Sequence, residues 1–74
     1  MAGNMAFKVD QIYPDPSSPV VAYRVVSRTA TTVHFQELYY QGGWTPRTVF
    51  TRQSAFSKGV EQVKITPTLI LKSS

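Results

Sequence analysis

Apolar and polar residues alternate along most of this chain, and no window keeps apolar residues at helical spacing for three turns. Val, Ile, Thr, Tyr, Phe and Trp, the residues that favour strands, are abundant in the same segments. The chain has 74 residues and no cysteine, so it can form one small domain without disulfide bonds. The sequence therefore predicts a single all-β domain.

Turn residues divide the chain into short expected strands. The segment Pro14–Pro19 contains three prolines and predicts an exposed loop, because proline cannot donate to a strand ladder. The Gly42-Gly43 pair predicts a hairpin turn, since glycine adopts positive φ without steric cost. Residues 53–59 are expected to form a short helical turn that ends at Gly59. The expected strands are residues 6–13, 20–27, 31–40, 45–52, 60–65 and 68–72.

The third expected strand changes its apolar face along its length. Val33 and Phe35 point to one side, whereas Leu38 and Tyr40 have the opposite parity. This change indicates a β-bulge or a strong bend near Glu37, and small barrels bend their strands in this way.

Five or six short strands with hairpin turns and one helical turn predict a small antiparallel SH3-like barrel. An OB-like barrel is the alternative, although its strands are usually longer. Residues 6–72 are expected to form this one domain, and residues 1–5 a disordered tail. The chain shows no signal-peptide pattern and no apolar run long enough to span a bilayer. A cytoplasmic location without membrane contact is expected.

Two segments carry a resemblance to other sequences. The first is Tyr23-Arg24-Val25-Val26-Ser27-Arg28-Thr29-Ala30 followed by Thr32-Val33, and the second is Gly59-Val60-Glu61-Gln62-Val63-Lys64-Ile65. The stretch from residue 23 to residue 65 is similar to short uncharacterised reading frames of phages and other mobile elements. The resemblance implies a small β-rich domain of mobile-element origin. It implies no activity and assigns no functional residue.

The chain offers little material for catalysis, since it has one histidine and four carboxylates. His34 as a base would need an orienting carboxylate, and Glu37 falls on the opposite face of a regular strand. The other carboxylates, which are Asp10, Asp15 and Glu61, show no metal-ligand spacing with His34. We therefore expect a non-enzymatic binding module without a cofactor or a metal.

Aromatic and basic residues around the expected hairpin favour nucleic acid as the partner. The chain carries a formal net charge of +4, which favours acidic partners. Stacking platforms beside guanidinium groups are typical of single-strand binding. The candidate contact residues are Tyr39, Tyr40, Trp44, Arg47 and Arg52, and Arg24, Arg28, Lys58 and Lys64 could extend a positive track. The structural alternative is that one of the tyrosines packs in the core and that the arginines only solubilise the chain.

A protein-interaction module is the second functional hypothesis. Such a module would be a small phage or mobile-element protein that docks on a host protein and inhibits it, or that binds an acidic protein surface. The Pro14–Pro19 loop, flanked by Tyr13 and Tyr23, could line a peptide groove. An exposed edge strand could also make the chain a homodimer.

Overall fold

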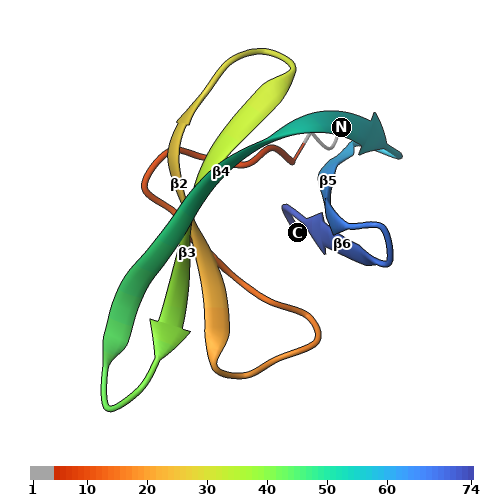
Figure 1. Cartoon of the computed structure of the whole chain (residues 1–74). Helices are drawn as coiled ribbons and strands as arrows, with labels where there is room; N and C mark the ends of the chain where they lie inside the picture. The colour runs from red at the N-terminus through yellow and green to blue at the C-terminus, as the bar shows by residue number, and fades with distance from the viewer. Residues whose placement is uncertain (1–4) are drawn as a thin grey trace.

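The computed structural model describes residues 5–74, which form six antiparallel strands in one strongly curled sheet, a half-barrel (Figure 1). Strands that follow one another in the sequence are neighbours in the sheet, in the order β1-β2-β3-β4-β5-β6. The strands are β1 (Ile12–Pro14), β2 (Val21–Arg28), β3 (Thr32–Tyr40), β4 (Trp44–Ser57), β5 (Val60–Thr66) and β6 (Leu69–Lys72). The structure confirms the all-β class and the small barrel-like architecture. The closer comparison with SH3-like or OB-like barrels stays a prediction.

The helical turn expected over residues 53–59 is wrong, because β4 continues through this segment to Ser57. The end of β4 pairs with the start of β5, from Ser54 opposite Val63 to Ser57 opposite Val60. Lys58 and Gly59 form the tight turn between them, with φ of 53° and 80°. Two-residue hairpin loops of type I′ require positive φ at both positions. Backbone pairing with β5 therefore outweighs the weak local preference for a helical turn.

The first expected strand is also wrong over much of its length. Residues 6–11 lie outside the strands, and β1 begins only at Ile12. Asp10 has a φ of 70° and turns the chain before β1. Phe7 is nevertheless buried, and Met5 forms an isolated parallel bridge with Val60. Of the tail expected to be disordered, residues 1–5, only Met5 is among the described residues; residues 1–4 lie outside them.

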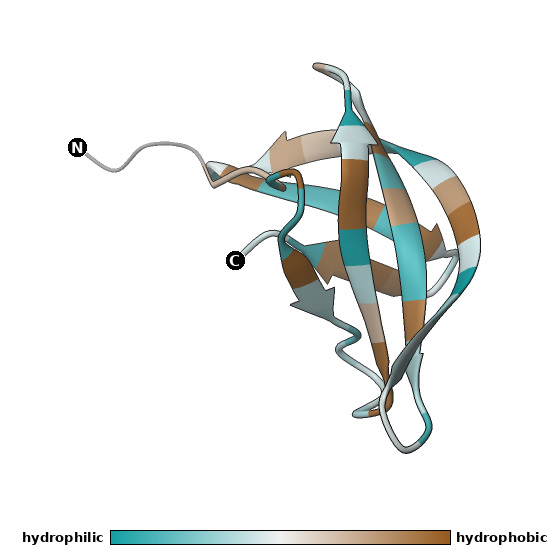
Figure 2. Cartoon of the chain, turned by 90° about the vertical axis from the view of Figure 1, so that its left-hand side faces the viewer, coloured by the Kyte–Doolittle hydropathy of each residue, from teal (hydrophilic) through white to brown (hydrophobic). Residues whose placement is uncertain are grey.

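The core lies on the concave side of the curled sheet, where strand residues of one parity meet the ring of Phe7. Aromatic edges contact aromatic faces within it, with ring centroids 5.4 Å apart for Phe7 and Phe35 and 6.2 Å apart for Tyr23 and Phe35. Bands of apolar and polar residues alternate along the strands in Figure 2. The core residues are Phe7, Tyr23, Val25, Val33, Phe35, Val63, Ile65 and Leu71.

A β-bulge is present near Glu37, where one was expected, but its extra residue lies on β4 and not on β3. The register between β3 and β4 shifts between Gln36 and Leu38, where two steps on β3 match three steps on β4. Pairing between β2 and β3 stays in step there, with Ala22 opposite Leu38. Paired residues share a face, so Ala22 and Leu38 lie on the face opposite to Phe35 and the core. The change of apolar face in β3 therefore creates a second apolar surface.

A buried ion pair joins β2 to β5. Arg28 donates from Nη1 to Glu61 Oε1 (2.6 Å) and from Nη2 to Glu61 Oε2 (2.7 Å). The Glu61 carboxylate, whose side chain is 0% exposed, also accepts bonds from the Phe7 amide and the Ser54 hydroxyl. Burial raises the pKa of Glu61, but the hydrogen bonds from Arg28 and Ser54 outweigh it and lower this pKa below its ordinary value. Arg28 is thus a structural residue.

Candidate binding site

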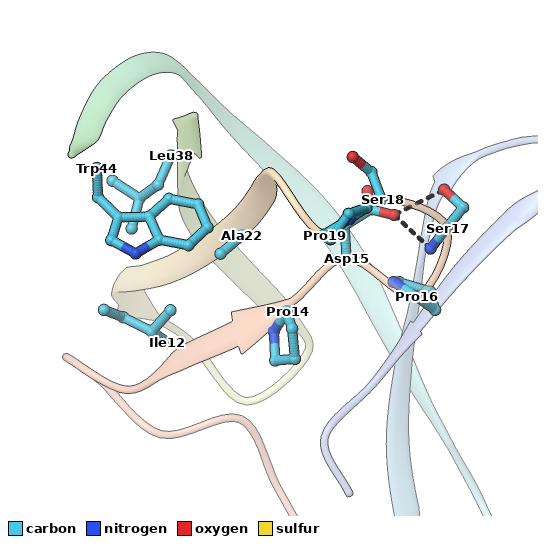
Figure 3. A pocket seen from close by; sticks show the side chains of 10 residues that line it. All are labelled: Ile12, Pro14, Asp15, Pro16, Ser17, Ser18, Pro19, Ala22, Leu38 and Trp44. Atoms are coloured by element: carbon cyan, nitrogen blue, oxygen red, sulfur yellow. Dashed lines mark hydrogen bonds between the residues drawn. The ribbon is translucent and has the colours of Figure 1, made fainter. Parts of the chain in front are cut away.

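A pocket of about 600 Å³ opens on the face of the sheet away from the core. Its floor is the buried pair Ala22 and Leu38, at neighbouring positions of β2 and β3. Pro14 of β1 pairs with Ala22, so it lies on the same face. Figure 3 shows the Trp44 indole beside Leu38 and Ala22, with Ile12 and Pro14 across the hollow. The lining residues are Ile12, Pro14, Asp15, Pro16, Ser17, Ser18, Pro19, Ala22, Leu38 and Trp44.

The proline-rich loop that forms one wall of the pocket is held in place by Asp15. One carboxylate oxygen accepts bonds from the amide and the hydroxyl of Ser17, both at 2.7 Å. The other accepts the hydroxyl of Tyr23 at 2.6 Å. Burial raises the pKa of Asp15, and the bonds from Tyr23 and Ser17 outweigh it and lower this pKa below its ordinary value. This wall is therefore anchored to the core through Tyr23.

The hairpin between β3 and β4 forms the other wall. Gly42 and Gly43 have φ of 70° and 152°, as expected for a turn that uses glycine. Tyr40 and Trp44 pair directly across the ladder, with ring centroids 5.3 Å apart. Both side chains are about half exposed, at 47% and 50%. The hairpin thus presents two aromatic rings at the rim of the pocket.

The structure divides the five predicted contact residues between different surfaces. Tyr40 and Trp44 lie on the pocket face. Tyr39 is the neighbouring position on β3 and therefore points to the other face, where the Arg47 guanidinium stacks on its ring at 4.7 Å. These two pairs lie near each other along the hairpin but do not share one face.

Arg52, the fifth predicted contact residue, is held by the backbone. It donates from Nε to the carbonyl of Lys64 and from Nη2 to the carbonyl of Ile65, both at 3.1 Å. Its guanidinium also covers the ring of Phe50 at 4.6 Å. These bonds join β4 and β5 where their ladder ends, so Arg52 has a structural role in the fold.

The pocket beside the proline-rich loop is not lined by the two tyrosines that were expected to line a peptide groove. Tyr23 is buried in the core, and Tyr13 packs against Phe7 with ring centroids 4.9 Å apart. Neither tyrosine lines the pocket, whose aromatic wall is Trp44. Sequence reasoning missed Ile12, Ala22 and Leu38. Leu38 has the opposite parity to Val33 and Phe35 in the same strand, and this pattern could have indicated an apolar surface on the face away from the core.

Little in the structure points to catalytic or metal chemistry. The Nδ1 atom of His34 lies 2.8 Å from the hydroxyl of Thr51. Within residues 5–74 there is no cluster of three or more side chains that could hold a metal ion. The same part of the chain contains no helix with the length and apolar character needed to cross a membrane.

No protein family, no curated protein and no solved structure matches this chain.

Proposed function

We propose that this chain is a non-enzymatic protein-interaction module whose pocket binds a short, uncharged apolar segment of a partner protein. The observation that carries the proposal is the apolar pocket between the proline-rich loop and Trp44. Its volume of about 600 Å³ lies in the range of ligand-binding sites in proteins.

The chemistry of the lining favours an uncharged occupant. Asp15 is the one ionisable side chain among the lining residues, and both of its oxygens accept hydrogen bonds within the chain. An anionic group that entered the pocket would lose water and meet only the negative charge of Asp15, and Asp15 is 9% exposed and already hydrogen-bonded, so it offers little to a cation. Aliphatic or proline side chains carry no charge, so they would enter the pocket without this loss of hydration.

Trp44 supplies the anchor for such a segment. Its indole is half exposed and lies in the wall of the pocket. Buried tryptophans dominate the energetics of many interfaces, and extended proline-rich segments dock on aromatic-lined grooves. The loop that carries the opposite wall is anchored by Asp15, so the pocket is formed before its occupant arrives.

The test is a selection of peptides from a displayed random library on the whole chain, followed by titration of the selected peptides against Trp44 fluorescence. We expect the selected peptides to be apolar, to shift the Trp44 emission and to lose about 30-fold in affinity on Trp44→Ala, the cost of removing a hot spot. The anisotropy of a labelled peptide measures binding to this variant.

Val49→Ala is the matched control. Val49 is 48% exposed and pairs with Gln36 on the face opposite to the core, but it does not line the pocket. Peptide affinity should be unchanged in this variant. Failure to select any peptide, or selected peptides that bind Trp44→Ala as tightly as the original chain, would exclude the proposed site.

A nucleic-acid interface at the hairpin, with Tyr39, Tyr40, Trp44, Arg47 and Arg52, stays a prediction. The stacking of Arg47 on Tyr39 supports it, because this pair lies on the same hairpin as Tyr40 and Trp44, although on the other face of the sheet. The backbone bonds of Arg52 weigh against it. Titration of single-stranded oligonucleotides against the chain with Arg47 and Arg52 both changed to Ala tests this interface.

A further inference from the structure

The outer face of the β5–β6 hairpin carries lysine side chains and no Asp or Glu side chain among residues 5–74. Glu61 and Val63 point into the core, so Gln62 and Lys64 point outward. On β6, Lys72 pairs with Gln62 and Ile70 pairs with Lys64, which places them on the same outer face. Lys58, in the turn between β4 and β5, borders this face beside Lys72. We call these residues, Lys58, Gln62, Lys64, Ile70 and Lys72, the basic face.

The carboxylates of the chain are elsewhere. Asp10 pairs with Arg24, Glu61 is buried against Arg28, Asp15 holds the proline-rich loop, and Glu37 lies on β3 opposite Tyr23. The chain has eight cations and four carboxylates. The five cations outside the basic face nearly balance the four carboxylates, so three of the four units of net charge come from the basic face. No Asp or Glu side chain lies on this face among residues 5–74.

Two shallow hollows lie side by side along the basic face. One, of about 320 Å³, is lined by Gln53, Ser54, Ala55, Gln62, Val63, Lys64 and Ile70. The other, of about 350 Å³, is lined by Ser57, Lys58, Val60, Gln62, Lys72 and Ser74. They share Gln62, and together they form a track with ammonium, amide and hydroxyl donors along it. These are the groups that contact phosphate oxygens in nucleic-acid complexes.

The backbone at Lys58 supports a role for this charge. Lys58 has a φ of 53° in a two-residue turn, a position where Asn, Asp or Gly is favoured. A lysine there is strained, and strained residues gather at functional sites. Lys58 and Lys72 line the same hollow, so an anion held there would be attracted by both charges.

We propose that the basic face binds the phosphate backbone of nucleic acid without sequence preference. Lys58, Lys64 and Lys72 contact phosphates, and Gln62 donates between them. Ile70 is the one large exposed apolar side chain of the face, so the apolar centre that a protein partner would need is missing. The proposal is independent of the peptide pocket, which shares no residue with the basic face.

The test measures the anisotropy of a labelled oligothymidylate of about 20 nucleotides with the whole chain, between about 50 mM and 200 mM salt. We expect binding that weakens steeply with salt. In the variant with Lys58, Lys64 and Lys72 all changed to Gln, affinity at low salt should fall by at least about tenfold, and the slope of log K against log salt should flatten by about 2. Circular dichroism confirms that the variant is folded.

The matched control changes Lys8, Arg24 and Arg47 to Gln, which removes the same net charge outside the basic face. This variant should bind nearly as tightly as the original chain. If both variants lose the same oligothymidylate affinity, the proposal is overturned, because binding then responds only to net charge. If only the control loses affinity, the binding surface is the β3–β4 hairpin and not the basic face. No binding of the oligothymidylate at low salt also overturns it, and binding of polyglutamate in its place would identify an acidic protein as the partner.

Discussion

Removal of the Arg28 side chain tests how the two halves of the sheet are held together. In Arg28→Ala, the Glu61 carboxylate keeps its bonds from the Phe7 amide and the Ser54 hydroxyl but loses both bonds from the guanidinium. The Glu61 side chain is 0% exposed in the folded chain, so the carboxylate is left without its cationic partner in a site that is otherwise closed to solvent. Breaking a buried ion pair in this way costs about 3–5 kcal/mol. A domain of 74 residues has a total stability of roughly 4–11 kcal/mol, so the variant should be close to unfolding.

Arg24→Ala is the matched control, since Arg24 lies on the same strand and also forms an ion pair. Its partner Asp10 is 79% exposed, and such pairs contribute about 0–1 kcal/mol. Urea unfolding followed by circular dichroism measures both variants. We expect a midpoint far below that of the original chain for Arg28→Ala and a small shift for Arg24→Ala. Equal shifts in the two variants would refute the assignment of Arg28 as a structural residue.

Three further predictions concern backbone conformation and pH. Changing Gly42 and Gly43 both to Val should lower the free energy of unfolding by about 1–2 kcal/mol in a urea titration, because both have positive φ although no atom blocks a Cβ. Lys58→Asn should raise the thermal midpoint, since Asn tolerates a φ of 53° better than Lys, and should weaken oligothymidylate binding in the same protein. The folded-state pKa values of Asp15 and Glu61 lie below their ordinary values, so both carboxylates stabilise the fold when they are ionised. The free energy of unfolding should therefore be at its full value above about pH 5 and should fall as acid protonates the two groups. A urea midpoint that does not change between neutral pH and about pH 3 would contradict this.

The Gly42-Gly43 turn and the bulge near Glu37 could be predicted from the sequence because their causes are local. Gly42 and Gly43 specify a hairpin by themselves, and the parity of Leu38 against Val33 and Phe35 located the bulge. The course of residues 53–59 could not be predicted in this way. Ser54 becomes part of a strand because Val63, nine positions later, offers it a backbone partner. Local propensity has no information about such a partner.

In the candidate sites too, the sequence identifies residues with a local signal and misses those whose role depends on a distant partner. Trp44 stood out because it is the one tryptophan and lies next to a predicted turn. The roles of Arg28 and Arg52 depend on partners in β5, 33 and 12–13 positions away, and a count of charges does not identify them. Because Arg28 and Arg52 make contacts within the fold, the positive charge that can contact a partner is concentrated at Lys58, Lys64 and Lys72. The basic face therefore depends on the tertiary structure and was not visible as a motif.

The pocket and the basic face belong to opposite ends of β4, and this predicts that they act independently. Trp44 begins the strand, and the turn with Lys58 follows its last residue. The 14 residues of β4 run from the pocket to this turn, and no residue lines both the pocket and the hollows of the basic face. Sites farther apart than about 10 Å with no shared partner have additive effects. Trp44→Ala should therefore leave oligothymidylate affinity unchanged, the triple lysine variant should leave peptide affinity unchanged, and the combined variant should show the two single losses. An effect of either variant on the other ligand would mean that one surface binds both.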